Sequence, residues 1–131
     1  LAVVWGADTG GFVFGMSLRG PKLAPSISPN KTWSGFIGGT LVAALGGWAV
    51  VAYMKGDASM QVLLYSAAIG VVSQVGDLFE SWIKRRFGIK DSGAIIPGHG
   101  GLFDRVDGLV AAALAAALLN ISLKGNLLVW L

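Results

Sequence analysis

Three aspartates lie within or beside the apolar segments of this sequence, where a carboxylate is most able to do chemistry. Asp77 is near the end of a hydrophobic run, and Asp104 and Asp107 are three residues apart, so both can face one side of a helix. A carboxylate in or beside hydrocarbon is costly and indicates a functional site. Converging carboxylates repel one another unless a cation lies between them, and hard oxygen ligands suit Mg²⁺. A magnesium site is one interpretation; the other is that each acid pairs with a neighbouring Lys or Arg.

Cations and glycines gather around two of these acids, in the polar stretch that separates the last two apolar segments. The cations are Lys84, Arg85, Arg86, Lys90 and Arg105. A basic rim on the cytoplasmic side of a membrane would explain the cations alone. Gly98, Gly100 and Gly101 add backbone N–H groups that can approach an anion without obstruction by a Cβ atom. Together these groups favour a Mg-bound polyphosphate as the ligand, and His99 is either a phosphate contact or a local hydrogen-bonding group.

A second polar loop precedes the apolar segment that begins at Trp33. It carries Ser28, Lys31 and Thr32 directly before a predicted helix, and the free N–H groups at a helix N-terminus favour anions. The Lys-Thr pair lacks the G-x-x-x-x-G-K spacing of a phosphate-binding loop. An ordinary N-cap by Thr32 or Ser34 is the alternative. Substrate binding and helix capping are therefore both open for this loop.

The composition is that of a chain surrounded by lipid. Of 131 residues, 54% are hydrophobic and 13% are charged, the mean hydropathy is +0.69, and a soluble domain has about 25% charged residues. Four segments approach the roughly 20 apolar residues that a span requires. They are Leu1–Leu18, Trp33–Met54, Met60–Phe79 and Gly108–Leu123. The sequence predicts an all-α, polytopic transmembrane bundle of about four spanning helices, with a buried helix as the alternative for the short fourth segment.

The polar joints between these segments place the charge on one side of the bundle. The two long joints, Arg19–Lys31 and Glu80–Asp107, hold eight of the ten cations and fall on the same side. Excess Lys and Arg marks the cytoplasmic side, so both joints are expected to face the cytoplasm close together. The first joint holds three of the four prolines and cannot be one continuous helix. The glycines of Trp33–Met54 are expected to let helices pack closely.

The chain begins with Leu1 inside an apolar run and has no charged leader. We therefore expect a fragment, a single membrane-embedded catalytic domain over residues 1–131 that forms the C-terminal part of a larger bundle. The absence of cysteine excludes a disulfide framework. Asp8, an acid among glycines in the first segment, is expected either to face the cavity of the other acids or to pair with a cation.

The 27 residues from Ser81 to Asp107 resemble the signature of the phosphatidate cytidylyltransferases, also called CDP-diacylglycerol synthases. The matching positions are Ser81, Lys84, Arg85, Lys90, Asp91, Gly93, Pro97, His99, Gly100, Gly101, Asp104, Arg105 and Asp107. The stretches ADTGGFVFGMSLRGPKLAPSISPNKTWSGFIGG and GDLFESWIKR are similar to the family as well. The resemblance thus runs from about Ala7 to Leu109, with Ser34 at a position where the family usually has Glu.

The resemblance implies the transfer of a cytidylyl group from CTP to phosphatidic acid, giving CDP-diacylglycerol and pyrophosphate. It implies a multi-pass enzyme of the inner membrane with its active site facing the cytoplasm. Mg²⁺ would be required, with K⁺ as a further cation, and Asp77, Asp104 and Asp107 would form the metal centre. The expected partners are CTP, phosphatidic acid and the lipid bilayer; nucleic acid is not expected, and a homodimer is left open.

The resemblance, together with the residue types, implies further roles. The expected catalytic residues are Asp77, Asp104, Lys90 and Arg105. The expected substrate-binding residues are Ser28, Lys31, Thr32, Lys84, Arg85, Asp91, His99, Gly100 and Gly101. Lys31, Lys90 and Arg105 would hold the triphosphate, while Lys84 and Arg85 would hold the phosphatidate head group. The alternatives are a CTP-dependent lipid-alcohol kinase, which would transfer the γ-phosphoryl group, and a non-enzymatic transporter or channel fragment.

Overall fold

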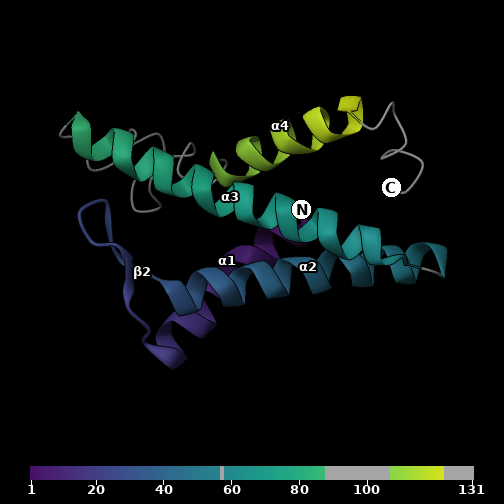
Figure 1. The fold of residues 1–131 in the computed structure, drawn as a ribbon, viewed down its shortest axis with the longest axis horizontal. Coiled ribbons are helices and arrows are strands. Elements are labelled where there is room, and N and C mark those ends of the chain that lie inside the picture. The colour runs from purple at the N-terminus through teal and green to yellow at the C-terminus, as the bar shows by residue number, and fades with distance from the viewer. Residues whose placement is uncertain (57, 88–106, 123–131) are drawn as a thin grey trace, which may run out of the picture.

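The computed structural model describes residues 1–56, 58–87 and 107–122. Over these residues the chain forms four helices and one two-stranded sheet (Figure 1). The elements are α1 (Ala2–Leu18), β1 (Lys22–Ala24), β2 (Ser28–Thr32), α2 (Trp33–Lys55), α3 (Met60–Arg86) and α4 (Asp107–Ser122). Helices α1 and α2 lie against each other, α3 packs on both, and α4 lies along α3 on the side away from α2 (Figure 1).

The two longest helices begin and end at clear local signals. Thr32 is the N-cap of α2, and its Oγ1 accepts a hydrogen bond from the Gly35 N–H at 3.1 Å. Gly56 ends α2 with φ 75°, a left-handed conformation that suits glycine. Helices α2 and α3 are long and apolar enough to cross a bilayer, whereas α1 and α4 have 17 and 16 residues. The described helices therefore support two of the four predicted spans.

The prediction of an all-α chain is wrong for the segment between α1 and α2. There β1 and β2 pair antiparallel, with Lys22 opposite Thr32 and Ala24 opposite Ser28. The prolines that prevent a helix in this joint fix φ near −65°, which extended backbone accepts. The Trp33 N–H donates to the Pro21 carbonyl at 3.0 Å and closes the base of the hairpin on α2. The proline-rich joint is therefore a hairpin arm at the N-terminal end of α2.

Helix α3 extends further than the hydropathy predicts. The apolar segment ends at Phe79, whereas the helix continues to Arg86. Glu80 and Lys84 form an ion pair at 2.8 Å one turn apart, which stabilises the added helix. Lys84, Arg85 and Arg86 lie in the last turn, where cations interact favourably with the helix dipole. The beginning of the predicted polar connection is thus helical.

Helices α1 and α2 approach each other closely because glycines lie at their interface. A Cβ atom at Gly35 would lie 2.6 Å from the Gly11 carbonyl oxygen, and one at Gly39 would lie 2.6 Å from the Ala7 carbonyl oxygen. The buried apolar residues of the described chain are Val4, Ala7, Ala43, Ala44, Val51, Val62 and Ala112. Such small residues let helices associate by van der Waals contact. The predicted role of the glycines in close packing is confirmed.

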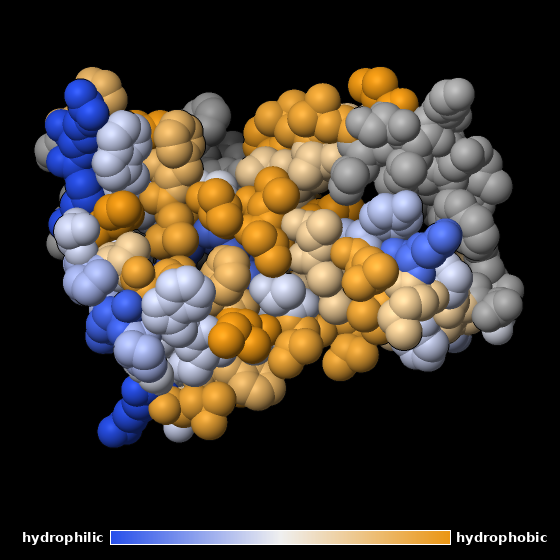
Figure 2. Space-filling view, in the orientation of Figure 1, coloured by the Kyte–Doolittle hydropathy of each residue, from blue (hydrophilic) through white to orange (hydrophobic). Residues whose placement is uncertain are grey.

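The large apolar side chains face outward instead. Trp5, Leu45 and Tyr53 are 66%, 57% and 93% exposed. Figure 2 shows apolar residues across the middle of the viewed face, with hydrophilic residues gathered at the end that carries the hairpin and the C-terminal end of α3. Soluble monomers rarely expose apolar patches larger than a few hundred Å². A small-residue interior with an apolar exterior indicates a membrane protein.

The glycine contacts predict that Gly39→Ala destabilises the fold. The new methyl group would meet the Ala7 carbonyl oxygen at 2.6 Å, and overpacking of this kind costs about 1–3 kcal/mol. Gly46→Ala, on the same helix, is the matched control because its nearest neighbour would be the Ala2 carbonyl oxygen at 3.5 Å. Thermal unfolding in detergent, followed by circular dichroism, measures both variants. Equal melting temperatures for the two would contradict the packing described here.

Candidate functional site

Several of the site residues predicted from sequence fall outside the described part of the chain. They are Lys90, Asp91, His99, Gly100, Gly101, Asp104 and Arg105. Asp107 is the first residue of α4, and its side chain is not described. The described candidates are Ser28, Lys31, Thr32, Asp77, Lys84 and Arg85. The roles predicted for the first group stay predictions.

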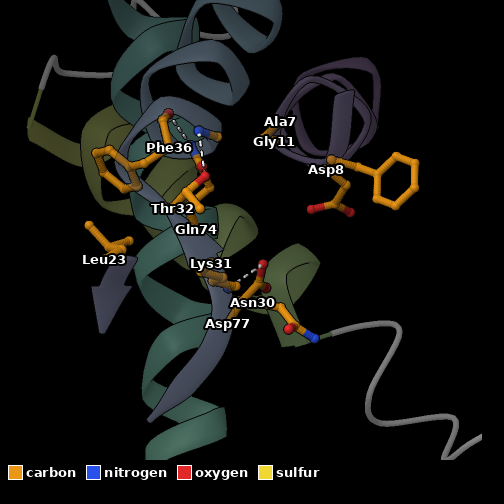
Figure 3. Close-up of a pocket in the computed structure, with 12 residues that line it drawn as sticks. Ala7, Asp8, Gly11, Leu23, Asn30, Lys31, Thr32, Phe36, Gln74 and Asp77 are labelled. Carbon is orange, nitrogen blue, oxygen red and sulfur yellow. Dashed lines mark hydrogen bonds and ion pairs between the residues drawn. The ribbon is translucent and has the colours of Figure 1, made fainter. Parts of the chain in front are cut away.

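A cavity of about 260 Å³ brings residues of α1, the hairpin, α2 and α3 together (Figure 3). Its polar lining residues are Asp8, Asn30, Lys31, Thr32, Gln74 and Asp77. Asp8 comes from α1 and points toward the space beside Asp77, which comes from α3 (Figure 3). Lys31 enters from β2, which the hairpin places over the N-terminal end of α2. The structure supports a place for Asp8 in the cavity of Asp77, and its pairing with a cation stays a prediction.

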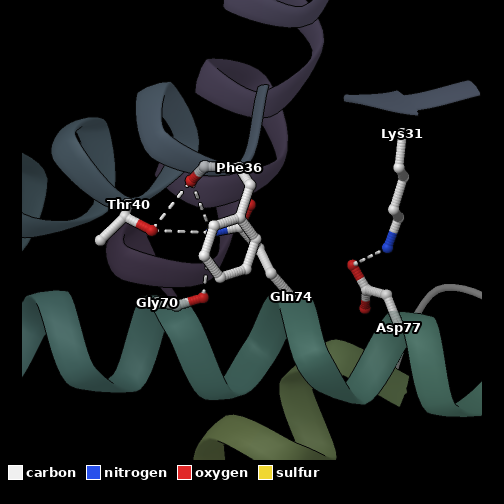
Figure 4. Close-up of polar contacts among 6 residues, drawn as sticks. All are labelled: Lys31, Phe36, Thr40, Gly70, Gln74 and Asp77. Atoms are coloured by element: carbon white, nitrogen blue, oxygen red, sulfur yellow. Dashed lines mark hydrogen bonds and ion pairs between the residues drawn. The ribbon is translucent and has the colours of Figure 1, made fainter. Parts of the chain in front are cut away.

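The cavity contains an ion pair that joins the hairpin to α3. The Lys31 Nζ lies 3.4 Å from the Asp77 Oδ2, although the two residues are 46 positions apart in sequence (Figure 4). Their side chains are 32% and 24% exposed, so both charges are partly withdrawn from solvent. Asp77 therefore does pair with a cation, and this cation comes from another element, the hairpin. The pairing brings together an acid and a cation that the sequence assigns to one site.

A buried glutamine ties α3 to α2 one turn before Asp77. The Gln74 Nε2 donates to the Thr40 Oγ1 at 3.1 Å, and the carbonyl oxygens of Phe36 and Gly70 lie within 3.4 Å of it (Figure 4). The Thr40 hydroxyl in turn donates to the Phe36 carbonyl at 2.9 Å. Sequence reasoning missed Gln74, although a polar side chain inside an apolar span is the signal that could have found it.

The polar residues at the start of α2 and in β2 differ in their contacts. Thr32 caps α2 through its Oγ1, and the residue also lines the cavity, so both interpretations of Thr32 are consistent with its position. Ser34 does not cap α2; its Oγ accepts from the Gly20 N–H at 3.2 Å instead. Ser28, at the start of β2, is not among the lining residues of the cavity.

The cations at the end of α3 make contacts within the chain. Lys84 pairs with Glu80 at 2.8 Å, and the Arg85 Nε donates to the Ile27 carbonyl of the hairpin tip at 3.4 Å. The second contact confirms that the described parts of the two cation-rich joints lie side by side. Neither Lys84 nor Arg85 lines the cavity of Asp77. Their role toward a phosphatidate head group stays a prediction.

Asp8 and Asp77 are the acids of the described chain that line this cavity. No group of three His, Cys, Asp or Glu side chains that could hold a metal ion occurs within residues 1–56, 58–87 and 107–122. Carboxylate oxygens are the ligands that Mg²⁺ prefers, so Asp77 fits a magnesium site in its chemistry. The rest of the predicted metal centre, Asp104 and the Asp107 side chain, lies outside the described residues, and the centre stays a prediction.

Comparison with protein families identifies the class to which this fold and site belong. Residues 1–122 match the model of the cytidylyltransferase family. The match covers all four helices and the hairpin, so the chain belongs to this family.

Individual relatives carry a more specific description. The chain is 54% identical over 112 residues to a phosphatidate cytidylyltransferase of Brucella suis, covering 86% of this chain and 42% of the relative. It is 47% identical over 108 residues to that of Staphylococcus epidermidis, covering 80% and 41%. It is 38% identical over 129 residues to that of Rickettsia conorii, covering 92% and 56%. The chain spans about half the length of the curated relatives it matches.

The contacts of Gln74 predict that Gln74→Leu destabilises the packing of α3 on α2. Loss of its interhelical hydrogen bonds should cost about 1 kcal/mol, and the burial of Gln74 leaves little room for water to replace them. Gln61→Leu, an exposed glutamine on the same helix, is the matched control and should change stability by less than about 0.5 kcal/mol. Chemical unfolding in detergent micelles measures the two. A similar loss in both variants would refute the interhelical role of Gln74.

Proposed function

We propose that this protein transfers a cytidylyl group from CTP to phosphatidic acid, giving CDP-diacylglycerol and pyrophosphate. The observation that carries the proposal is the meeting of Lys31, Asp77 and Asp8 in one cavity of a chain that belongs to the cytidylyltransferase family. The names of the relatives supply the lipid substrate.

The reaction is a displacement at phosphorus. A phosphate oxygen of phosphatidic acid attacks the α-phosphorus of CTP and forms the new P–O bond. The bond from the α-phosphorus to the oxygen bridging it to the β-phosphate breaks, and pyrophosphate leaves with that electron pair. Catalysis of such transfers is mostly positioning and charge stabilisation. The protein therefore has to hold two polyanions side by side, and it requires no covalent intermediate.

Lys31 is the described cation placed to serve this step. Its ammonium group lies beside Asp77 in an ion pair at 3.4 Å, and its backbone belongs to β2 of the hairpin. A positive charge held in place and partly withdrawn from water stabilises developing phosphate charge more strongly than a solvated one. We assign Lys31 to the phosphates of CTP.

The proposal includes a magnesium ion, with K⁺ as a further cation. Asp77 would hold the magnesium ion, together with Asp104 and Asp107 from the adjoining part of the chain. The bound ion would supply neutralisation of the phosphate charge. Asp77 shares its cavity with a second carboxylate, Asp8, which supports a cation in this place.

The proposed setting is the inner membrane, with the hairpin end facing the cytoplasm. Six described cations, Arg19, Lys22, Lys31, Lys84, Arg85 and Arg86, belong to the hairpin arm or the last turn of α3. Excess Lys and Arg marks the cytoplasmic side of membrane proteins. CTP would enter from the cytoplasm, and phosphatidic acid would enter from the bilayer.

The proposal predicts that Asp77→Asn lowers the formation of CDP-diacylglycerol about a hundredfold, because a carboxylate that would hold the magnesium ion is lost. Lys31→Gln should lose activity as well, and Lys31→Arg should retain more of it because the positive charge remains. The assay measures conversion of labelled CTP and phosphatidic acid in membranes that contain the protein. Lys55→Gln, a charge change at the opposite end of α2, is the control.

The same assay tests the metal and the reaction class. Activity should disappear with EDTA and return with Mg²⁺. Full activity of Asp77→Asn would refute the assignment of this site. Transfer of phosphate to a lipid alcohol, without CDP-diacylglycerol, would replace the proposal by a CTP-dependent lipid kinase.

A further inference from the structure

A second cavity, of about 530 Å³, lies beside the one that contains Asp77. The two share Gly11, Phe12, Asn30 and Thr32 as lining residues, so they are neighbours across one wall. The remaining residues around the second cavity are Gly15, Met16, Arg19, Gly20 and Lys22. They come from the C-terminal half of α1 and from the hairpin arm.

The charge of this second cavity is purely cationic among the described residues. Arg19 and Lys22 line it, and no Asp or Glu does. Neither cation forms an ion pair with any side chain in the described ranges, where the ion pairs are Lys31 with Asp77 and Lys84 with Glu80. The Asn30 amide adds a neutral donor. The lining suits an anion rather than a metal ion.

The backbone at this cavity is fixed in an unusual conformation. Arg19 ends α1 with φ 44° and ψ 42°, the left-handed region that a residue with a Cβ atom rarely adopts. The next residue, Gly20, donates its N–H to the Ser34 Oγ, and a Cβ atom there would lie 2.9 Å from that oxygen. The turn from α1 to β1 is thereby anchored on α2. It places Arg19 and Lys22 around one cavity, and uncommon backbone of this kind is often found at binding sites.

The walls of the cavity include exposed apolar side chains. Phe12 and Met16, one turn apart on α1, are 67% and 60% exposed and line it. An anion bound between Arg19 and Lys22 would thus carry an apolar portion along α1. A lipid with a phosphate head group has this character, whereas a nucleotide triphosphate is polar along its phosphate chain. The acid-containing cavity next to it suits the metal-bound nucleotide better.

We propose that Arg19, Lys22 and Asn30 bind the phosphomonoester head group of the lipid substrate, with Phe12 and Met16 against its apolar portion. This assignment rests on the proposed function, and it names the place of the lipid within the same site. The shared wall then puts the attacking phosphate oxygen next to the cavity of Lys31 and Asp77. Lys84 and Arg85, predicted from sequence to hold this head group, contact Glu80 and the Ile27 carbonyl, and their role toward the head group stays a prediction.

Equilibrium binding tests this assignment independently of catalysis. The protein is reconstituted in phosphatidylcholine nanodiscs and titrated separately with short-chain phosphatidate, glycerol 3-phosphate and CTP. Arg19→Gln and Lys22→Gln should each weaken binding of both phosphomonoesters about tenfold, as expected for loss of one charge-assisted contact. CTP binding should change less than about twofold, and Lys55→Gln should leave all three ligands unaffected. Arg19→Gly removes the cation while favouring the left-handed backbone, so its loss of binding cannot be attributed to misfolding.

The titration and the activity assay on the same variants together decide the assignment. Unchanged phosphatidate binding in the Arg19 and Lys22 variants would overturn it. A selective loss of CTP binding would overturn it in favour of a nucleotide site. Specific phosphatidate binding through these cations, without any formation of CDP-diacylglycerol, would uphold the lipid site and refute the proposed reaction. Formation of CDP-diacylglycerol with an unchanged KM for phosphatidate in both variants would uphold the reaction and refute the lipid site.

Discussion

The ion pair between Lys31 and Asp77 links the two parts of the molecule on which the site depends. Lys31 belongs to a hairpin arm whose own pairing is short, with three residues in one strand and five in the other. Asp77 belongs to a helix of 27 residues. Their contact, at 3.4 Å, and the Arg85 contact to Ile27 hold the arm against α3. They place the Lys31 ammonium group beside the Asp77 carboxylate of α3.

The helices supply a frame in which such a contact can persist. Glycines and other small residues let α1 and α2 approach so closely that the backbone of one helix leaves no room for a larger side chain on the other. The Gln74 hydrogen bonds connect α3 to α2 next to the cavity. Large apolar side chains are left on the outside, where lipid can cover them. The core of small residues and the charged groups at the hairpin end are therefore in different parts of the bundle, and the charges do not disturb the packing of the core.

The sequence allowed some of this to be predicted, and physical reasons explain the rest. The starts of α2 and α3, at Trp33 and Met60, were predictable because a capping Thr32 and a glycine turn mark them. The hairpin was missed because prolines signal only that a helix is excluded, and strand pairing depends on a partner segment. The extension of α3 to Arg86 was missed because hydropathy marks only the apolar part of a helix. The polar residues that follow are also helical, and the ion pair of Glu80 with Lys84 stabilises them. From the sequence, Lys31 and Asp77 could be assigned to one site, but their ion pair could not be predicted. The two residues are 46 positions apart, and no local sequence signal encodes such a contact.

The most direct test of this account is a double-mutant cycle on the formation of CDP-diacylglycerol with Lys31→Gln, Asp77→Asn and the double variant. Residues that act as one unit give strongly non-additive losses. If Lys31 and Asp77 form one site, the double variant will be about as impaired as Asp77→Asn alone. A double variant whose loss equals the product of the two single losses would show that Lys31 and Asp77 act independently, and would contradict the shared site.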